Sequence, residues 1–210
     1  MYIPKPNQET RVPVLWQLIR SQPLGTLVTL GSGGLFASHI PMLLEEDGSE
    51  FGMLKGHIAR ANPQWKDFSP AVDALAIFAG AQHYISPNWY PGKQEHGKEV
   101  PTWNYVVVHA YGSLKIIEDH SWLLSFLNQL TDTHEAISPV PWSVKDAPQD
   151  FITAMMNAIV GLELPIRRIE GKWKLSQNKM PRDRQGVVEG LSKLDTPASL
   201  AMRALIEEIN

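Results

Sequence analysis

The sequence predicts an α+β fold: a largely antiparallel sheet curled into a barrel, with helices packed outside it. Three observations predict this class. Segments with strand character, separated by Gly, Asp or Pro turns, fill most of residues 24–118. Helical periodicity precedes them and returns after Glu118, and a last strand-like segment at 162–177 comes before two closing helices. We expect a single domain over residues 1–210, more helical from about 119 onward.

An amphipathic helix opens the chain over residues 10–20. Val12, Leu15, Trp16 and Ile19 follow the i, i+3, i+4, i+7 spacing of one helical face. Pro23 blocks its continuation, because proline cannot donate the next backbone hydrogen bond. The helix is therefore short.

Five strand segments follow, each rich in β-branched or aromatic residues. They are LGTLVTLG at 24–31, GLFASHIPMLL at 34–44, EFGMLKGHI at 50–58, ALAIFAG at 74–80 and NYVVVHAYGSLKIIE at 104–118. The Gly-rich stretch at 31–34 is not followed by the Lys-Ser/Thr pair or the helix of a phosphate loop. It is therefore interpreted as a hairpin turn.

Two helices are predicted after Glu118. Leu123, Leu127 and Leu130 mark the first, with Asp119 as its N-cap. Residues 148–161 form the second, which we expect Gly161 to end.

The last third of the chain returns to strand character at 162–177. Gly171 is expected at a tight turn or bulge within it. The final helix opens with Thr196-Pro197, an N-cap followed by proline at the first helical position. Leu200, Ala204 and Leu205 are expected to form its docking face.

Composition excludes several classes of protein. Hydrophobic residues make up 43% and charged residues 20%, and no apolar run reaches the ~20 residues of a membrane helix. The N-terminus lacks a secretory signal, so we expect a cytoplasmic protein. The absence of cysteine excludes disulfides and thiolate catalysis, and the net charge of −3 gives no overall attraction to nucleic acid.

The stretch GHIARANPQW at 56–65 is the first candidate site. His57 leaves a strand, Arg60 follows in the loop, and Asn62 can cap a short helix that begins at Pro63. Free backbone N–H groups beside a guanidinium and an imidazole suit an anion, most naturally phosphate. The alternative is a surface arginine beside a capping asparagine, with His57 paired to a backbone carbonyl.

The second candidate is the Pro- and Gly-restrained segment 84–105, interpreted as a loop. It concentrates five aromatic residues: Tyr84, Trp89, Tyr90, Trp103 and Tyr105. Such rings can wall a planar ligand, bury a subunit interface or pack a core, and the sequence leaves all three open.

The third candidate is the basic run RRIEGKWKLSQNKMPRDR at 167–184, which carries seven Lys or Arg against two acidic residues. It could bind a ligand phosphate or a DNA backbone, or be a solvated turn. Templates for metal or nucleophilic hydrolysis are missing: no His pair has metal-ligand spacing and no Ser lies in a Gly-x-Ser-x-Gly elbow. No metal site is expected.

Four motifs in register resemble the PaiB family of FMN-binding split-barrel proteins: GHIARANPQWKDF, YISPNWYP, VPTWNY and EGKWKLSQN. The resemblance extends from MYIPK at the N-terminus to GVVEGL at 186–191. It implies a six-stranded split barrel with peripheral helices, related to flavin reductases and pyridoxamine phosphate oxidases. It also implies a homodimer with FMN at the subunit junction, and a negative transcriptional regulator.

The resemblance implies an FMN site that the residues themselves suit. Arg60, with His57 and Asn62, would clamp the phosphate, and Lys55 or Lys174 would add to the clamp. The ring would lie among Trp89, Tyr90, Trp103 and Asn104, and Ser176, Gln177 and Asn178 could reach its polar edge from either subunit. Weaker candidates are Thr26, Thr29 and His39.

Two functional classes follow from this site. One is a flavin-dependent regulator, and the other is an FMN oxidoreductase acting on a small molecule. Direct DNA binding has little support, because the chain is acidic and has neither a helix-turn-helix pattern nor a zinc module.

Overall fold

The computed structural model describes residues 1–209, which form two compact units. Unit 1 consists of Met1–Leu18, Ala79–Val108 and the residues from Glu170 onward, and unit 2 consists of Ile19–Phe78 and His109–Ile169. The single domain expected over residues 1–210 stays a prediction.

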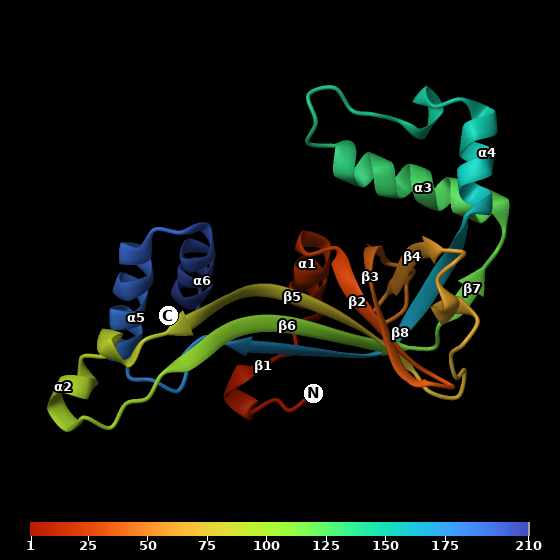
Figure 1. Cartoon of the computed structure of the whole chain (residues 1–210). Coiled ribbons are helices and arrows are strands. Elements are labelled where there is room, and N and C mark those ends of the chain that lie inside the picture. Colours follow the sequence, from red (N-terminus) through yellow and green to blue (C-terminus); the bar gives the residue numbers. More distant parts are fainter. Residues whose placement is uncertain (210) are drawn as a thin grey trace. The chain divides into compact units, whose positions relative to one another are not determined.

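The strands form one antiparallel sheet that closes partly into a ring (Figure 1). The order of the strands in the sheet is β1-β8-β4-β3-β2-β5-β6, and β7 also pairs with β8. A further pairing of β8 with β6 closes the ring, which consists of β2, β3, β4, β8, β6 and β5. The strands are β1 (Gln8–Glu9), β2 (Leu24–Gly31), β3 (Gly34–Glu45), β4 (Met53–Ala59), β5 (Ala74–Ile85), β6 (Thr102–Gly112), β7 (Lys115–Ile117) and β8 (Ile159–Lys174). The predicted fold class is confirmed.

The helices are α1 (Val12–Ser21), α2 (Gly92–His96), α3 (His120–Glu135), α4 (Gln149–Asn157), α5 (Pro181–Leu194) and α6 (Pro197–Glu207). The expected N-caps are confirmed. Asp119 Oδ1 accepts the Trp122 N–H at 2.7 Å, and Thr196 Oγ1 accepts the Ser199 N–H at 3.1 Å. None of the helices described over residues 1–209 combines the length and the apolar content that a membrane crossing needs.

The Gly-rich stretch forms the predicted hairpin turn in unit 2. β2 pairs along its whole length with residues 34–41 of β3, and Gly31 faces Gly34 at the end of the ladder. Gly34 has φ of +109°, a conformation that L side chains rarely adopt. The glycine therefore permits the reversal.

The prediction for Gly161 is wrong, and Gly171 does not form the tight turn that was one of its two expected roles. α4 ends at Asn157, and Gly161 lies inside β8, where a Cβ would stand 2.4 Å from the Trp122 ring. Gly171 also lies inside β8, opposite Glu9, and a Cβ there would stand 2.2 Å from Leu15 Cδ2. Both glycines permit close packing against a strand rather than ending an element.

The aromatic segment 84–105 is not a continuous loop. Tyr84 lies on β5, and Trp103 and Tyr105 lie on β6, so cross-strand pairing positions these rings. Trp89 ends the short 3₁₀ helix Pro87–Trp89, and Tyr90 follows it directly.

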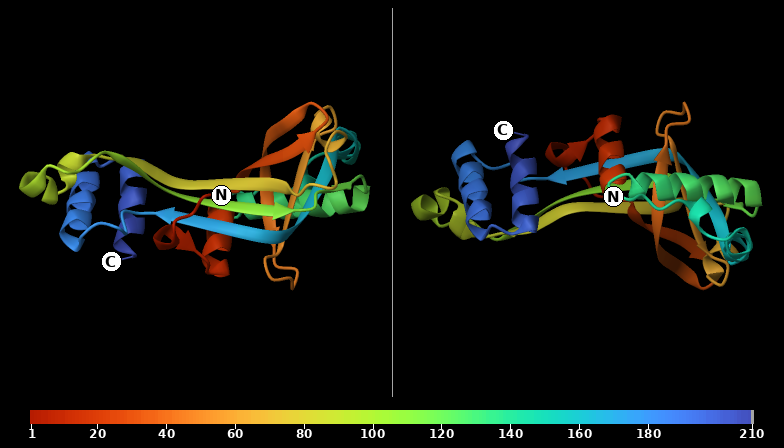
Figure 2. Two further views of the ribbon diagram at one scale, coloured as in Figure 1. Left: turned by 90° about the horizontal axis from the view of Figure 1, so that it is seen from below. Right: turned by 90° about the horizontal axis from the view of Figure 1, so that it is seen from above.

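α5 and α6 lie side by side in unit 1 (Figures 1 and 2). Their core contains Val187 and Leu191 from α5 with Met202 and Ile206 from α6. The expected docking face of α6 is wrong for Leu200, which is 38% exposed, and for Ala204, which is also exposed, whereas Leu205 packs against this core as expected. Met202 and Ile206, four residues apart, form the buried part of the contact.

Candidate functional site

The outer face of β4 in unit 2 carries the first set of expected ligand-binding residues. Burial alternates along this strand, so that Leu54 and Ile58 face the core while Lys55 and His57 lie half-buried on the opposite side. α3 covers this outer face: the Phe126 ring lies edge-on to His57 at 5.7 Å and stacks on Trp122 at 5.3 Å. His57 therefore lies beneath a helix.

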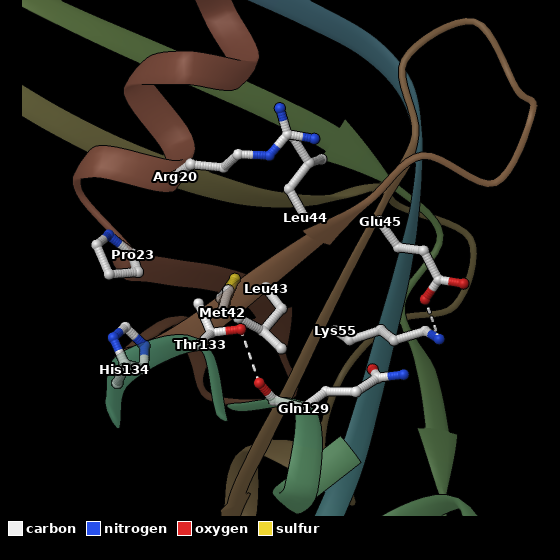
Figure 3. Close-up of a pocket in the computed structure, with 10 residues that line it drawn as sticks. All are labelled: Arg20, Pro23, Met42, Leu43, Leu44, Glu45, Lys55, Gln129, Thr133 and His134. Atoms are coloured by element: carbon white, nitrogen blue, oxygen red, sulfur yellow. Dashed lines mark hydrogen bonds and ion pairs between the residues drawn. The ribbon is translucent and has the colours of Figure 1, made fainter. Parts of the chain in front are cut away.

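Further along α3, the residues on the same face are polar. Gln129 and Thr133 follow Phe126 at helical spacing, and they help to line a pocket of about 520 Å³ (Figure 3). This volume lies within the usual range of small-molecule sites, roughly 300–1,000 Å³. The complete lining is Arg20, Pro23, Met42, Leu43, Leu44, Glu45, Lys55, Gln129, Thr133 and His134.

Basic groups outnumber acidic groups in this lining. Lys55 is paired with Glu45 (Figure 3), and its side chain is only 15% exposed. Arg20 donates to Glu46, which lies outside the lining, at 2.5 Å. The lining thus holds two basic side chains and one carboxylate beside an apolar surface from β3.

The turn after β4 holds Arg60 firmly. Its guanidinium donates to the backbone oxygens of Asn157 at 2.9 Å and Ile159 at 3.2 Å, and to Glu118 at 2.6 Å. Three of its five N–H donors are thereby used, and the side chain remains 35% exposed. Arg60 is therefore a fixed, partly accessible cation.

His57 and Asn62 are less available to a ligand. His57 Nδ1 is buried and has no hydrogen-bond partner within residues 1–209, and burial lowers the pKa of its imidazole. Asn62 caps the 3₁₀ helix Pro63–Trp65 as predicted: its Oδ1 accepts the Gln64 N–H at 3.0 Å, and its Nδ2 donates to Ser38 at 2.9 Å. The contacts of Asn62 support the shape of the turn, and Arg60 supplies its positive charge.

The aromatic candidates of the segment 84–105 include two accessible rings, Tyr84 and Trp103, and two packed ones, Trp89 and Tyr90. Trp103 is 48% exposed, edge-on to Tyr84 at 6.2 Å, and its Nε1 donates to Gln82 at 3.1 Å. Trp89 packs so closely on α5 that a Cβ at Gly190 would stand 2.3 Å from its indole. Tyr90 is only 1% exposed within the core shared with α5 and α6. The core-packing interpretation therefore holds for these two rings.

The polar residues of unit 1 that were expected to bind FMN are partly occupied by hydrogen bonds within the protein. Asn104 is fully buried and donates to Ser176 Oγ at 2.9 Å, and Ser176 has φ of +65°. Lys174 donates to a threonine hydroxyl on β6 at 2.6 Å, while Gln177 bonds backbone atoms of its own turn. Asn178 is exposed. The structure brings Asn104 and Ser176 together as a buried pair.

The weaker candidates lie on the β2–β3 hairpin. Thr26 and His39 face each other across the two strands. Thr29 is buried and bonds the amide of Gln64, a residue that the sequence analysis did not single out. Gln64 Nε2 also donates to the carbonyl oxygens of Leu27 and Phe36, so this glutamine joins the turn after β4 to the hairpin.

The basic run at 167–184 is largely neutralised by neighbouring groups. Three of its cations form ion pairs with carboxylates, and the Arg168 guanidinium lies 3.5 Å from the Tyr111 ring centroid. The ion pairs are Arg167 with Asp73, Lys179 with Glu99, and Arg182 with Glu95. The run is therefore not an open strip of positive charge.

Most of the 520 Å³ pocket was not predicted from the sequence. Of its lining residues, only Lys55 was singled out. The signal that could have found it is the spacing of Trp122, Phe126, Gln129 and Thr133, which places rings and polar groups on one face of α3.

Sequence comparisons match this chain to known proteins over nearly its full length. A family model described as "Putative FMN-binding domain" matches residues 1–168. The protein "Protease synthase and sporulation protein PAI 2" of Bacillus subtilis is 32% identical over 210 residues, covering 99% of this chain and 97% of that protein. "Uncharacterized protein AN0679" of Emericella nidulans is 34% identical over 243 residues, with the same coverage of each chain.

Solved structures share the fold at low sequence identity. The FAD and heme binding protein of Mycobacterium smegmatis matches with a TM-score of 0.55 and 16% identity, over 80% of this chain and 73% of that one. The conserved hypothetical protein Rv2991 of Mycobacterium tuberculosis matches with a TM-score of 0.55 and 15% identity, over 86% and 94%. FMN, the cofactor expected from the sequence, is the one in the family's description. The chain therefore belongs to the PaiB-like FMN-binding domain family.

Proposed function

We propose that this chain is a cytoplasmic, homodimeric FMN protein that acts as a negative regulator of gene expression through its bound flavin. The name of the Bacillus subtilis relative, which refers to protease synthesis and sporulation, supports the regulatory part of the proposal. The observation that carries the flavin part is Arg60, a partly exposed guanidinium on the turn after β4. This turn lies within the matched residues 1–168.

Arg60 suits the FMN phosphate because its orientation is already fixed. Backbone oxygens of Asn157 and Ile159 hold the guanidinium, so binding costs little side-chain entropy. Its planar fork matches two phosphate oxygens, and the phosphate would compete with the exposed Glu118 carboxylate. Asn62 supports the turn, and His57 precedes it on β4. Lys174 is a second candidate cation, and Lys55, the other cation that the resemblance implied, lines the 520 Å³ pocket.

Within unit 1, the other residues that the resemblance assigns to FMN provide a ring surface and polar groups. Trp103 offers an exposed indole on which a flat ring can stack. Trp89 and Tyr90 pack in the core of unit 1, Asn104 and Ser176 form a buried pair, and Gln177 and Asn178 follow the end of β8. FMN, when bound, would supply the redox chemistry that these side chains lack.

The dimer is proposed on the exposed aromatic rings. Tyr84 is 44% exposed and Trp103 is 48% exposed, and both residue types are enriched in subunit interfaces. Sedimentation velocity would test this part, and a monomer at every concentration, with and without FMN, would contradict it.

Regulation is proposed to be indirect. The ion pairs of Arg167, Lys179 and Arg182 leave the basic run little net charge for a DNA backbone. A promoter-fragment mobility shift that weakened steeply with salt, and with Lys172 and Arg182 neutralised, would overturn the indirect route and establish direct contact.

The decisive test of the flavin site is an FMN titration of the wild-type protein and of Arg60→Ala. We expect the variant to bind FMN more weakly by about 2–3 kcal/mol, the scale of a charge-assisted hydrogen bond. Arg203→Ala is the matched control, since it removes another partly exposed arginine from an ion pair, here with Glu207. Equal FMN affinity in Arg60→Ala and the wild type would remove Arg60 from the site.

The enzyme alternative requires a separate measurement on the FMN-loaded protein. Reduction of the flavin by a nicotinamide donor, with reoxidation by an acceptor over many turnovers, would identify an oxidoreductase. A bound flavin that is inert to donors would favour the regulator.

A further inference from the structure

We propose that the 520 Å³ pocket of unit 2 is a second ligand site, which takes a small organic anion with an apolar body, in addition to FMN. The anionic group would bind at Lys55, and the apolar body would lie on the β3 residues Met42, Leu43 and Leu44.

The basic groups of the lining favour an anion over a cation. Arg20 and Lys55 line the pocket, and Glu45 is the only carboxylate among the lining residues, while the Glu46 carboxylate that pairs with Arg20 lies outside the lining. Lys55 is the less exposed of these two cations, with 15% of its side chain accessible against 47% for Arg20. An anion that reaches Lys55 is thus partly shielded from water, which strengthens the attraction between the two charges.

The existing ion pair leaves Lys55 able to accept a ligand. Glu45 is 43% exposed, so water can solvate its carboxylate when a ligand anion takes its place beside Lys55. Lys55 also has three N–H donors, of which the carboxylate uses one. A ligand anion can therefore share the ammonium with Glu45 or replace it at little cost.

The α3 side of the pocket has unused polar groups. Within residues 1–209, the side chains of Gln129 and His134 make no hydrogen bond, and Thr133 donates only to the Gln129 backbone oxygen, at 2.7 Å. Figure 3 shows these groups on α3 along one side of the pocket and Met42 and Leu43 from β3. A few polar groups beside an apolar surface is the usual composition of a small-molecule site.

The pocket results from a change of residue size along α3. At Trp122 and Phe126 the helix is joined to the sheet by rings that pack on Gly161 and His57. At Gln129 and Thr133 no ring fills the space, and the volume of about 520 Å³ remains.

Three probes with one benzene ring test the proposal by calorimetric titration of the full-length protein. Phenyl phosphate and benzoate carry an anionic group, and benzylamine is their cationic counterpart. We expect saturable binding of phenyl phosphate or benzoate and none of benzylamine. The stronger anion identifies a phosphate ester or a carboxylate as the head group. Failure of both anions at millimolar concentration, or equal binding of benzylamine, would overturn the proposal.

Two variants place the binding in this pocket. Lys55→Met should weaken the anion about tenfold or more, as expected for loss of a charged hydrogen bond. Thr133→Trp should abolish saturable binding by filling the space from an exposed helix position. Lys115→Met is the matched control. Lys55 on β4 and Lys115 on β7 both lie opposite Glu163 of β8, one on each side of that strand, but only Lys55 lines the pocket. Unchanged binding in Lys55→Met and Thr133→Trp would overturn the assignment.

FMN separates this proposal from the flavin site. The probe titrations are run without FMN and on protein saturated with FMN, and the anion should bind in both. If FMN displaces the anion competitively, the pocket belongs to the flavin, and the second site is overturned. A protein that binds the anion but never FMN would contradict the proposed function and leave the second site standing.

Discussion

The two ends of the contact between α3 and the sheet differ in what fills them. At one end, Trp122 and Phe126 stack on each other and lie against Gly161 and His57. At the other end, where Thr133 lies on the same face of the helix, the contact opens into a pocket. The difference indicates that one helix face both anchors the helix and leaves room for a ligand, according to the size of its side chains.

The largest effect is expected from removing the anchor. Phe126 is 2% exposed and contacts both His57 and Trp122, so Phe126→Ala should lower the free energy of unfolding by about 3–5 kcal/mol. Urea unfolding measures this loss. Phe151→Ala on α4 is the control, since Phe151 is 53% exposed and its truncation should change stability by no more than about 0.5 kcal/mol. Equal losses in the two variants would mean that the ring stack does not anchor α3.

The next effect depends on pH and concerns the imidazole under the anchored end. Burial lowers the pKa of His57 below its ordinary value of 6.5, so the unfolded chain binds the proton more tightly than the folded protein. The stability that the folded protein has with a neutral His57 is fully present above pH 6.5, and it is lost as the pH falls from 6.5 toward the pKa of His57 in the folded protein.

The urea midpoint of the wild type should therefore decrease when the pH is lowered from about 7.5 to about 5.5, about one unit on either side of the ordinary pKa. His57→Leu should show a smaller fall over the same range. An identical pH dependence in both proteins would show that His57 does not carry the effect.

The smallest effect is expected at the open end. Gln129 lines the pocket and its side chain makes no hydrogen bond within residues 1–209, so Gln129→Ala should change the unfolding free energy by no more than about 0.5 kcal/mol. The same variant should weaken the anionic probe if the amide contacts it. A large loss of stability would mean that the open end also anchors the helix, and the comparison of the two ends would fail.

Local sequence signals predicted most secondary structure correctly. The caps at Asp119 and Thr196 and the hairpin at 31–34 depend on a few neighbouring residues, so a linear pattern identifies them. The close packing at Gly161 and Gly171 could not be predicted in this way, because the side chains that leave no room for a Cβ there, Trp122 and Leu15, are far away in sequence.

The candidate site shows the same division. Arg60 was identified from its motif, but its partners Asn157, Ile159 and Glu118 could not be, since about 60 to 100 residues separate them from it. Tyr90 looked like a ligand-binding ring, and its burial depends on packing against α5 and α6.

The sequence by itself determined the family, the antiparallel barrel class, the helix starts and the group of basic and aromatic residues from which an FMN site is proposed. Periodicity, turn chemistry and motifs in register are local properties that a linear pattern carries. The tertiary structure alone decided which of these side chains are held, buried or accessible, and it alone revealed the pocket beside Lys55. A cavity is volume left between elements, and no segment records it before the elements pack.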